Sequence, residues 1–190
     1  AKTKWSSIVS EKEIMYDVKD YVATITINRP KTLNAFTGDN IVEMERLILE
    51  ATADKKVGVI VLTGSGERAF CVGGDVNWEK DAGGKSGLEG LKFNFNRHIV
   101  ECPKPVIARV NGYALGGGFE MVLGCDIVVA CDEASFGLPE VKIGLFPMQV
   151  LSLLQRLVPA RTVREWCLTG EPFTAAEALA AGLLNHVVPA

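Results

Sequence analysis

Residues 112–120 read Gly112-Tyr113-Ala114-Leu115-Gly116-Gly117-Gly118-Phe119-Glu120, a glycine loop that leads from a predicted buried strand, 106–110, into a short predicted helix, 119–124. Glycine lets backbone N–H groups approach a ligand without an intervening side chain. The amino end of a helix adds unpaired N–H donors and a dipole that favours negative charge. The stretch therefore predicts an anion-binding loop at the junction of a strand and a helix.

A second glycine loop, Ala69-Phe70-Cys71-Val72-Gly73-Gly74-Asp75, follows the apolar run 57–62. Together the two loops could hold one oxyanion between two amides, each ~2.7–3.1 Å from the developing charge. The alternative is that the glycines only make tight turns and close packing. The 112–120 loop lacks the P-loop pattern, and a dinucleotide-binding fingerprint is poorly supported.

The remaining pattern alternates strands with helices along the whole chain, which indicates the α/β class. Thr37 is a predicted helix cap, and Thr174 opens a capping-box pattern for a helix that ends at Gly182. Residues 63–74 are expected to be a loop, and residues 81–90 a polar, glycine-rich segment. The other predicted elements are strands at 21–28 and 127–131 and a helix marked by Leu88, Leu91, Phe95 and Ile99.

Two glutamates stand beside these loops. Glu120 lies in the first turn after Gly118, and Glu140 follows the strand 127–131. One helix and one strand separate them, which can return the chain to the same end of a sheet. Two carboxylates in a small, dry site could bind one water and move protons to and from it, with their titrations pushed apart. The alternative is a helix-dipole glutamate and an unrelated surface glutamate.

The composition argues against several classes of protein. Hydrophobic residues make up 48% and charged residues 23% of the 190 residues, and the net charge is -3. A sizeable core is therefore expected, and no basic run offers nucleic acid an electrostatic footprint. No apolar run reaches the ~18 residues of a membrane helix, so no membrane partner is expected.

The cysteines and histidines do not indicate a metal site. The five cysteines form no C-x-x-C pair, which suggests free thiols in a reducing, cytoplasmic compartment. The two histidines, His98 and His186, have no ligand-like spacing to a cysteine.

Taken together, the segments resemble the crotonase superfamily, the enoyl-CoA hydratase/isomerase family, from about Val22 to Pro189. The ordered set of matching segments is Ile27–Pro30 with Leu33–Ala35, Ala69–Asp75, Lys104–Ala108, Gly112–Glu120, Cys125–Asp126, Phe136–Glu140 and Leu168–Gly170 with Ala178–Pro189. Each piece alone is weak, whereas the set in this order is specific.

This resemblance implies one core domain over residues 1–190, folded as a right-handed spiral of ββα units and assembled as a homotrimer or homohexamer. The implied ligand is an acyl-CoA thioester whose carbonyl oxygen lies between the backbone amides of Gly74 and Gly117. The residues implied to contact the coenzyme A and acyl parts are Lys31, Leu33, Val72, Asp75, Val76 and Asn77.

The implied reaction is reversible syn addition of water to a 2-enoyl-CoA, since hydratases of this family carry glutamate at both positions that match Glu120 and Glu140. Glu120 would deprotonate water and Glu140 would protonate the α-carbon, although the two could share these roles. No metal or redox cofactor is implied.

The sequence also departs from the family pattern. The helical C-terminal part that helps to form trimers is expected to be missing or truncated. Residues 145–150 replace a glycine-rich turn, and there Phe146 and Met148 could reshape the acyl pocket or simply pack in a loop.

Other functions stay open at this point. Within the family they are a cyclic enoyl-CoA hydratase, a naphthoyl-CoA synthase-like enzyme, a ring hydrolase and an isomerase. The segment 58–74 and the glycine-rich residues 83–90 are similar to the synthases and ring hydrolases. Outside it they are an RNA-binding or scaffold protein, which the acidic balance disfavours, and a metal-dependent hydrolase, which would need clustered ligands.

Overall fold

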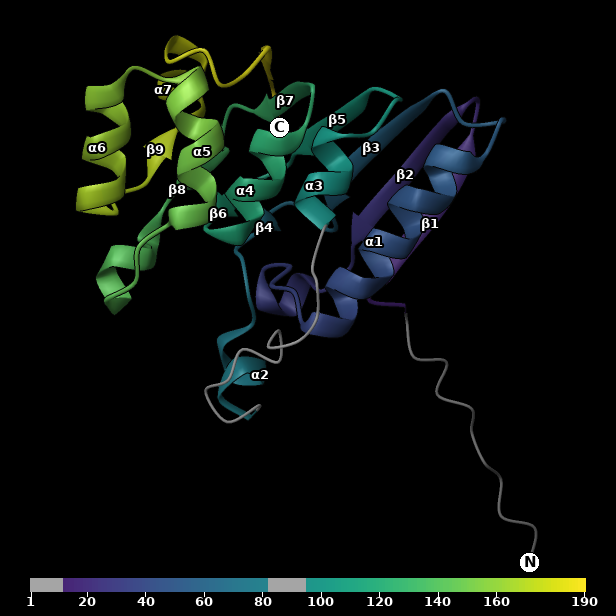
Figure 1. Cartoon of the computed structure of the whole chain (residues 1–190), viewed down its shortest axis with the longest axis horizontal. Helices are drawn as coiled ribbons and strands as arrows, with labels where there is room; N and C mark the ends of the chain where they lie inside the picture. Colours follow the sequence, from purple (N-terminus) through teal and green to yellow (C-terminus); the bar gives the residue numbers. More distant parts are fainter. Residues whose placement is uncertain (1–11, 82–94) are drawn as a thin grey trace, which may run out of the picture.

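The computed structural model describes residues 12–81 and 95–190, which form two sheets with helices packed against them (Figure 1). The larger sheet has the order β1-β2-β3-β5-β7-β10, and the smaller one has the order β4-β6-β8-β9. The strands of the larger sheet are β1 (Ile14–Lys19), β2 (Val22–Ile27), β3 (Val59–Gly64), β5 (Val106–Val110), β7 (Ile127–Cys131) and β10 (His186–Val188). The strands of the smaller sheet are β4 (Ala69–Cys71), β6 (Tyr113–Leu115), β8 (Ser135–Gly137) and β9 (Phe173–Thr174).

The helices connect and cover these strands. The α-helices are α1 (Gly38–Ala53), α2 (Val76–Asp81), α3 (Phe95–Val100), α4 (Gly117–Gly124), α5 (Met148–Leu157), α6 (Ala160–Thr169) and α7 (Ala175–Ala180), with 3-10 turns η1 (Pro30–Thr32) and η2 (Pro139–Ile143). In Figure 1, α1, α3 and α4 follow one another along one face of the larger sheet. None of the helices within 12–81 and 95–190 is long and apolar enough to cross a bilayer.

The chain repeats a unit of two strands followed by a helix. Strands β3, β5 and β7 lie side by side and parallel, and each passes at its end into β4, β6 or β8 of the smaller sheet. The chain then returns through a helical segment. This arrangement confirms the predicted α/β class and the spiral of ββα units.

Two asparagines stabilise the corner between β3 and β4. The side-chain nitrogen of Asn34 donates to the carbonyl oxygens of Ser65 and Ala69, at 3.0 and 2.7 Å. Asn111 donates to the carbonyl of Gly64 at 3.0 Å and also bonds to Gly66. These bonds satisfy backbone groups that leave one sheet before they join the other, so the corner keeps its buried polar atoms paired.

Aromatic rings fill the space between the small sheet and the following helices. Phe119, Phe136 and Phe173 are buried, with ring centroids 5.6–5.9 Å apart, and Trp166 stacks on Phe173. Because Phe119 belongs to α4 and Phe136 to β8, this cluster fixes the segments that carry Glu120 and Glu140 against each other.

Several predicted elements are confirmed. β2 alternates buried Ala23, Ile25 and Ile27 with partly exposed threonines, as its sequence pattern predicts. Thr37 and Thr174 cap α1 and α7 through reciprocal side-chain and backbone hydrogen bonds. Both caps depend only on residues three positions apart.

The loop predictions need correction. Residues 63–74 contain β4 as well as the end of β3, and the 112–118 loop contains β6. Each of these strands has three residues, too few to show a clear alternation of apolar and polar side chains. Helix α4 begins at Gly117 rather than at Phe119. Glycine is a poor helix former, so the sequence pattern alone places the start too late. Close packing against Phe36 and Cys71 is what requires glycine at positions 117 and 118. The predicted features at 82–94, which include Leu88, Leu91 and the glycine-rich insert, lie outside the described residues.

A matched pair of substitutions on α5 tests this core. Leu154 is fully buried and Leu157 is about half exposed. Leu154→Ala should lower the free energy of unfolding by ~2–5 kcal/mol, because it leaves a cavity, whereas Leu157→Ala should cost less than ~1 kcal/mol. Denaturant unfolding of both variants measures the difference. An equal loss of unfolding free energy in the two variants would contradict the described packing of α5.

Candidate active site

The two predicted glycine loops meet. Strands β4 and β6 pair in parallel, so the segments after them emerge at the same edge of the smaller sheet. A β-carbon placed on Gly73 would lie 3.2 Å from the backbone nitrogen of Gly117, and one on Gly118 would lie 2.1 Å from the carbonyl oxygen of Cys71. The second distance is far below any real contact, so a side chain at position 118 would push the two loops apart.

Each loop presents a backbone amide at this junction. Gly117 is the first residue of α4, where the helix leaves its N–H groups without intrahelical partners. Gly74 is held by an isolated bridge to Phe36. Among the described residues, no backbone acceptor outside the regular elements is found for the N–H of either Gly74 or Gly117. The prediction that these two amides bind an anionic ligand therefore meets no competing backbone hydrogen bond in the described part of the chain.

The two glutamates lie beside the same loops. Glu120 is in the first turn of α4 and Glu140 is in η2. A β-carbon placed on Gly116 would lie 3.2 Å from Oε1 of Glu140, so this carboxyl group lies close to the backbone just before α4. Oε2 of Glu140 is buried and has no hydrogen-bond partner among the described residues. Such an orphaned oxygen is costly in a structural role and useful in a site that takes up water or substrate.

Burial raises the pKa of both carboxyl groups. For Glu120, burial is the largest cause, a hydrogen bond with Asn96 opposes it, and the charge of Glu140 raises the pKa further. For Glu140, burial raises the pKa and a backbone hydrogen bond partly offsets it. The pair therefore sits in an environment that disfavours two negative charges at once, as an acid–base pair requires.

The other predicted contact residues are more dispersed. Val72 lies in the first glycine loop and is half-buried, whereas Val76 and Asn77 begin α2 with exposed side chains. Lys31 and Leu33 lie in and just after η1, with Lys31 exposed and Leu33 lining a recess of about 100 Å³ beside Arg68 and Ala69.

The Asp75 side chain has internal partners. One oxygen accepts from the amides of Asn77 and Trp78, and the other pairs with Arg29 at 2.9 Å. Burial alone would raise the pKa of Asp75, but these hydrogen bonds hold it below its ordinary value. The carboxylate of Asp75 therefore stabilises the loop, and its predicted contact with the ligand stays a prediction.

Sequence reasoning missed Asn96 and Cys167. Asn96 lies in α3, and its hydrogen bond to Glu120 joins residues that are far apart in the sequence. Cys167 lies in α6, where burial and the charge of Glu140 raise the pKa of its thiol. No local motif marks either residue, so only the packing of helices reveals them.

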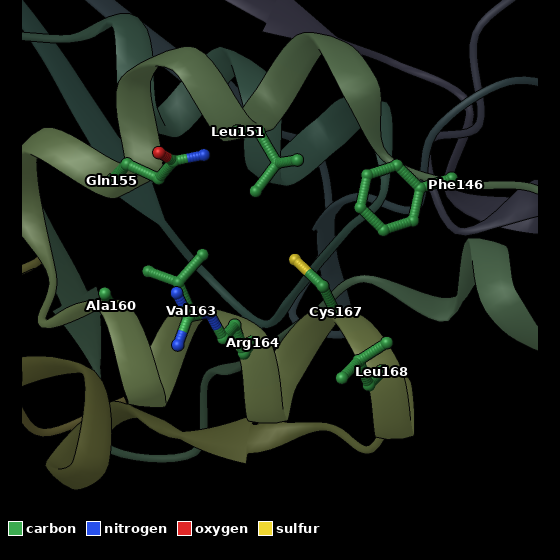
Figure 2. A pocket seen from close by; sticks show the side chains of 8 residues that line it. All are labelled: Phe146, Leu151, Gln155, Ala160, Val163, Arg164, Cys167 and Leu168. Carbon is green, nitrogen blue, oxygen red and sulfur yellow. The ribbon is translucent and has the colours of Figure 1, made fainter.

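A pocket of about 240 Å³ opens between α5 and α6 (Figure 2). Figure 2 shows Leu151 on one wall, Val163 and Cys167 on the other, and the ring of Phe146 at one end. Met148 is exposed and is not among the lining residues. The pocket is mostly apolar, and Gln155 and Arg164 add polar groups to its wall.

Other singled-out residues have structural surroundings. The indole of Trp78 packs against the first turn of α1, where a β-carbon on Gly38 would lie 2.8 Å from it. His98 in α3 contacts Glu45 at 3.2 Å, and His186 is an exposed residue of β10. Over 12–81 and 95–190, no group of three or more histidine, cysteine or acidic side chains could hold a metal ion.

Comparison with known proteins is consistent with this geometry. A family model for enoyl-CoA hydratase/isomerase matches residues 17–190. The short-chain-enoyl-CoA hydratase of Clostridium acetobutylicum is 40% identical over 188 residues, a match that covers 96% of this chain and 69% of that protein.

Solved structures of hydratases are also similar to this chain. An enoyl-CoA hydratase subunit of Geobacillus kaustophilus superposes with a TM-score of 0.86 and 37% identity, covering 94% of this chain and 69% of that one. A carnitinyl-CoA hydratase of Mycobacterium avium superposes with a TM-score of 0.84 and 38% identity, covering 95% and 70%.

The buried carboxyl group of Glu140 predicts a pH-dependent stability. Its pKa is raised above the ordinary value of 4.5, so the folded protein holds this proton more tightly than the unfolded chain does. The contribution of Glu140 to the free energy of unfolding is therefore lost in the wild-type protein as the pH rises from 4.5 through the folded-state pKa. Glu140→Gln removes this loss, so its melting temperature should rise relative to wild type as the pH increases.

The measurement is thermal unfolding of the two proteins across that pH range. Glu165→Gln on the exposed side of α6 is the matched control, since it changes a glutamate outside the site. A constant difference in melting temperature between Glu140→Gln and wild type would show that Glu140 is not buried as described.

Proposed function

The chain belongs to the enoyl-CoA hydratase/isomerase family, and we propose that it is an enoyl-CoA hydratase that adds water reversibly to a 2-enoyl-CoA thioester, giving a 3-hydroxyacyl-CoA. The observation that supports this proposal is that two half-buried glutamates, Glu120 and Glu140, lie next to the junction at which Gly73 approaches Gly117. In the proposal, the amides of Gly74 and Gly117 polarise the thioester, and the two glutamates move the protons of one water.

In the proposed reaction, the thioester oxygen accepts hydrogen bonds from the two amides. They draw electron density from the conjugated double bond, which makes the β-carbon electrophilic. One amide donor aimed at a developing oxyanion is worth ~100- to 1000-fold in rate. Gly117 adds the favourable dipole at the amino end of α4.

The glutamates then move the protons. Ionised Glu120 takes a proton from water as the water oxygen bonds to the β-carbon, and the electrons of the double bond pass to the α-carbon and thioester oxygen. Protonated Glu140 gives its proton to the α-carbon. Transfer of the proton from Glu120 to Glu140 restores the starting state, so the net change is addition of one water.

The roles of one ionised and one protonated carboxyl group match the raised pKa of both and the charge coupling that raises that of Glu120. The hydrogen bond from Asn96 stabilises the ionised form of Glu120, which supports its assignment as the base.

The other parts of the proposal follow the family. Lys31 and Leu33 would border the nucleotide part of coenzyme A, and Val72, Val76, Asn77 and the backbone of Asp75 would border its acyl-bearing arm. We propose a homotrimer or homohexamer, and the free cysteines favour the reducing conditions of the cytoplasm.

Hydration of crotonyl-CoA tests the function. The wild-type protein should bleach the absorbance of the conjugated enoyl thioester, and Glu140→Gln and Glu120→Gln should each lower kcat by at least ~100-fold, since each removes a proton-transfer group. Both variants should still bind the product thioester in a calorimetric titration, because the amides remain.

Glu165→Gln serves again as the control and should keep wild-type turnover. Wild-type kcat in either site variant would refute the role given to that glutamate. A wild-type protein that binds crotonyl-CoA and leaves its absorbance unchanged, yet turns over a cyclic enoyl thioester, would redirect the proposal to a ring substrate.

The proposed mechanism uses no metal ion. Dialysis against EDTA should therefore leave the rate of crotonyl-CoA hydration unchanged. Loss of activity on chelation, with recovery on addition of a divalent cation, would contradict the assignment of the proton transfers to Glu120 and Glu140.

A further inference from the structure

Arg29 lies at the centre of a polar network next to the first glycine loop. Its guanidinium pairs with Asp75 at 2.9 Å, contacts Glu13 at 3.2 Å, and donates to the backbone carbonyl of Ala35. Only 15% of the Arg29 side chain and 11% of that of Asp75 are exposed. Salt screens such a pair weakly, so it constrains the loop more firmly than a surface pair does.

The segment that Arg29 holds, Ala35–Phe36, touches both glycine loops. The backbone of Phe36 donates to the carbonyl of Gly73 and accepts from the amide of Asp75, each at 2.9 Å, so it brackets Gly74 from both sides. The ring of Phe36 faces the other loop, where a β-carbon on Gly117 would lie 2.9 Å from its Cζ atom. Phe36 therefore spans the gap between the two amides.

The same network reaches α1. Glu13 joins Arg29 to the side chain of Asn40 at 2.8 Å, and Asn40 forms the reciprocal cap of α1 with Thr37. Arg29 is thus tied through Glu13 to the first turn of α1. A loop with two adjacent glycines has little rigidity of its own and needs such support.

We propose that Arg29 and Phe36 are positioning residues that set the distance and direction of the Gly74 amide relative to the Gly117 amide. Arg29 acts through Ala35 and Asp75, and Phe36 acts through its backbone bridge and its ring. The inference rests on the proposed function in so far as those amides bind the thioester oxygen.

A purely structural role for the same residues predicts something different. Loss of a mainly buried ion pair would lower stability, while the surviving folded protein would bind and polarise the thioester normally. A positioning role predicts a folded protein with weaker polarisation of the thioester, lower kcat and little change in KM. The reason is that the weakened hydrogen bond, from the Gly74 amide to the thioester oxygen, is strongest in the transition state.

The test uses para-dimethylaminocinnamoyl-CoA, a conjugated thioester whose absorption moves to longer wavelength when its carbonyl oxygen is hydrogen-bonded. The variants are Arg29→Lys, which keeps the charge but loses the planar fork, and Phe36→Leu, which shortens the spacer. Arg46→Lys is the matched control, because Arg46 pairs with Glu43 and Glu50 on the exposed side of α1.

We expect a smaller red shift in Arg29→Lys and Phe36→Leu than in wild type or Arg46→Lys. Turnover of crotonyl-CoA should fall by ~10- to 100-fold in kcat, the size expected for a misplacement of up to ~1 Å. The double variant Arg29→Lys with Asp75→Asn should lose no more than the worse single variant, because both changes act on one pair.

A full wild-type red shift and kcat in folded Arg29→Lys and Phe36→Leu would overturn the proposal. If Arg29→Lys does not fold, Asp75→Asn gives the decision, since its amide oxygen can still accept from the amides of Asn77 and Trp78. A normal red shift in folded Asp75→Asn would overturn the role of the pair.

The outcome is separable from that of the proposed function. The red shift requires only binding and polarisation, so a wild-type protein that shifts the probe but does not hydrate crotonyl-CoA would reject hydration and leave the positioning test intact. A wild-type protein that binds the probe without any shift would overturn the positioning inference itself.

Discussion

The close approach of two glycine backbones, at Gly73 and Gly117, is the constraint on which the rest of the site depends. A β-carbon on Gly73 would lie 3.2 Å from the nitrogen of Gly117, and one on Gly117 would lie 3.6 Å from the α-carbon of Gly73. This contact exists because β4 and β6 pair in parallel, so both loops leave the sheet at one edge. Larger residues would separate the amides and remove the geometry that a single oxyanion needs.

Around this contact the protein accepts an electrostatic cost. Glu120 and Glu140 are partly buried next to each other, and the pKa of each is raised. Both the raised pKa values and the unpaired Oε2 of Glu140 oppose folding at neutral pH, since the ionised forms are poorly solvated. The aromatic cluster of Phe119, Phe136 and Phe173 supplies apolar burial in the same region and holds the two segments in place.

The sequence allowed good prediction where the relevant contacts are local or follow an ordered pattern. The caps at Thr37 and Thr174 and the alternation in β2 were predicted, because each depends on neighbours within a few residues. The α/β class and family also followed from sequence. The short strands β4 and β6 were missed, because three residues carry almost no periodic signal.

Contacts between distant segments could not be predicted in this way. The bond from Asn96 to Glu120, the pair of Arg29 with Asp75 and the proximity of Cys167 to Glu140 all arise from tertiary packing. The positions of Glu120 and Glu140 could be proposed from the order of motifs, but their shared burial required the structure. These distant contacts, rather than the motifs, determine how the site is held.

In the proposed mechanism, two carboxyl groups act on one water and one double bond beside a pair of amides. Hydration of crotonyl-CoA by the full chain in deuterium oxide tests it most directly, with the product analysed for the stereochemistry at its α- and β-carbons. We expect one deuterium at the α-carbon, added to the same face as the new hydroxyl group. Addition to opposite faces, or deuterium distributed over both faces, would contradict it.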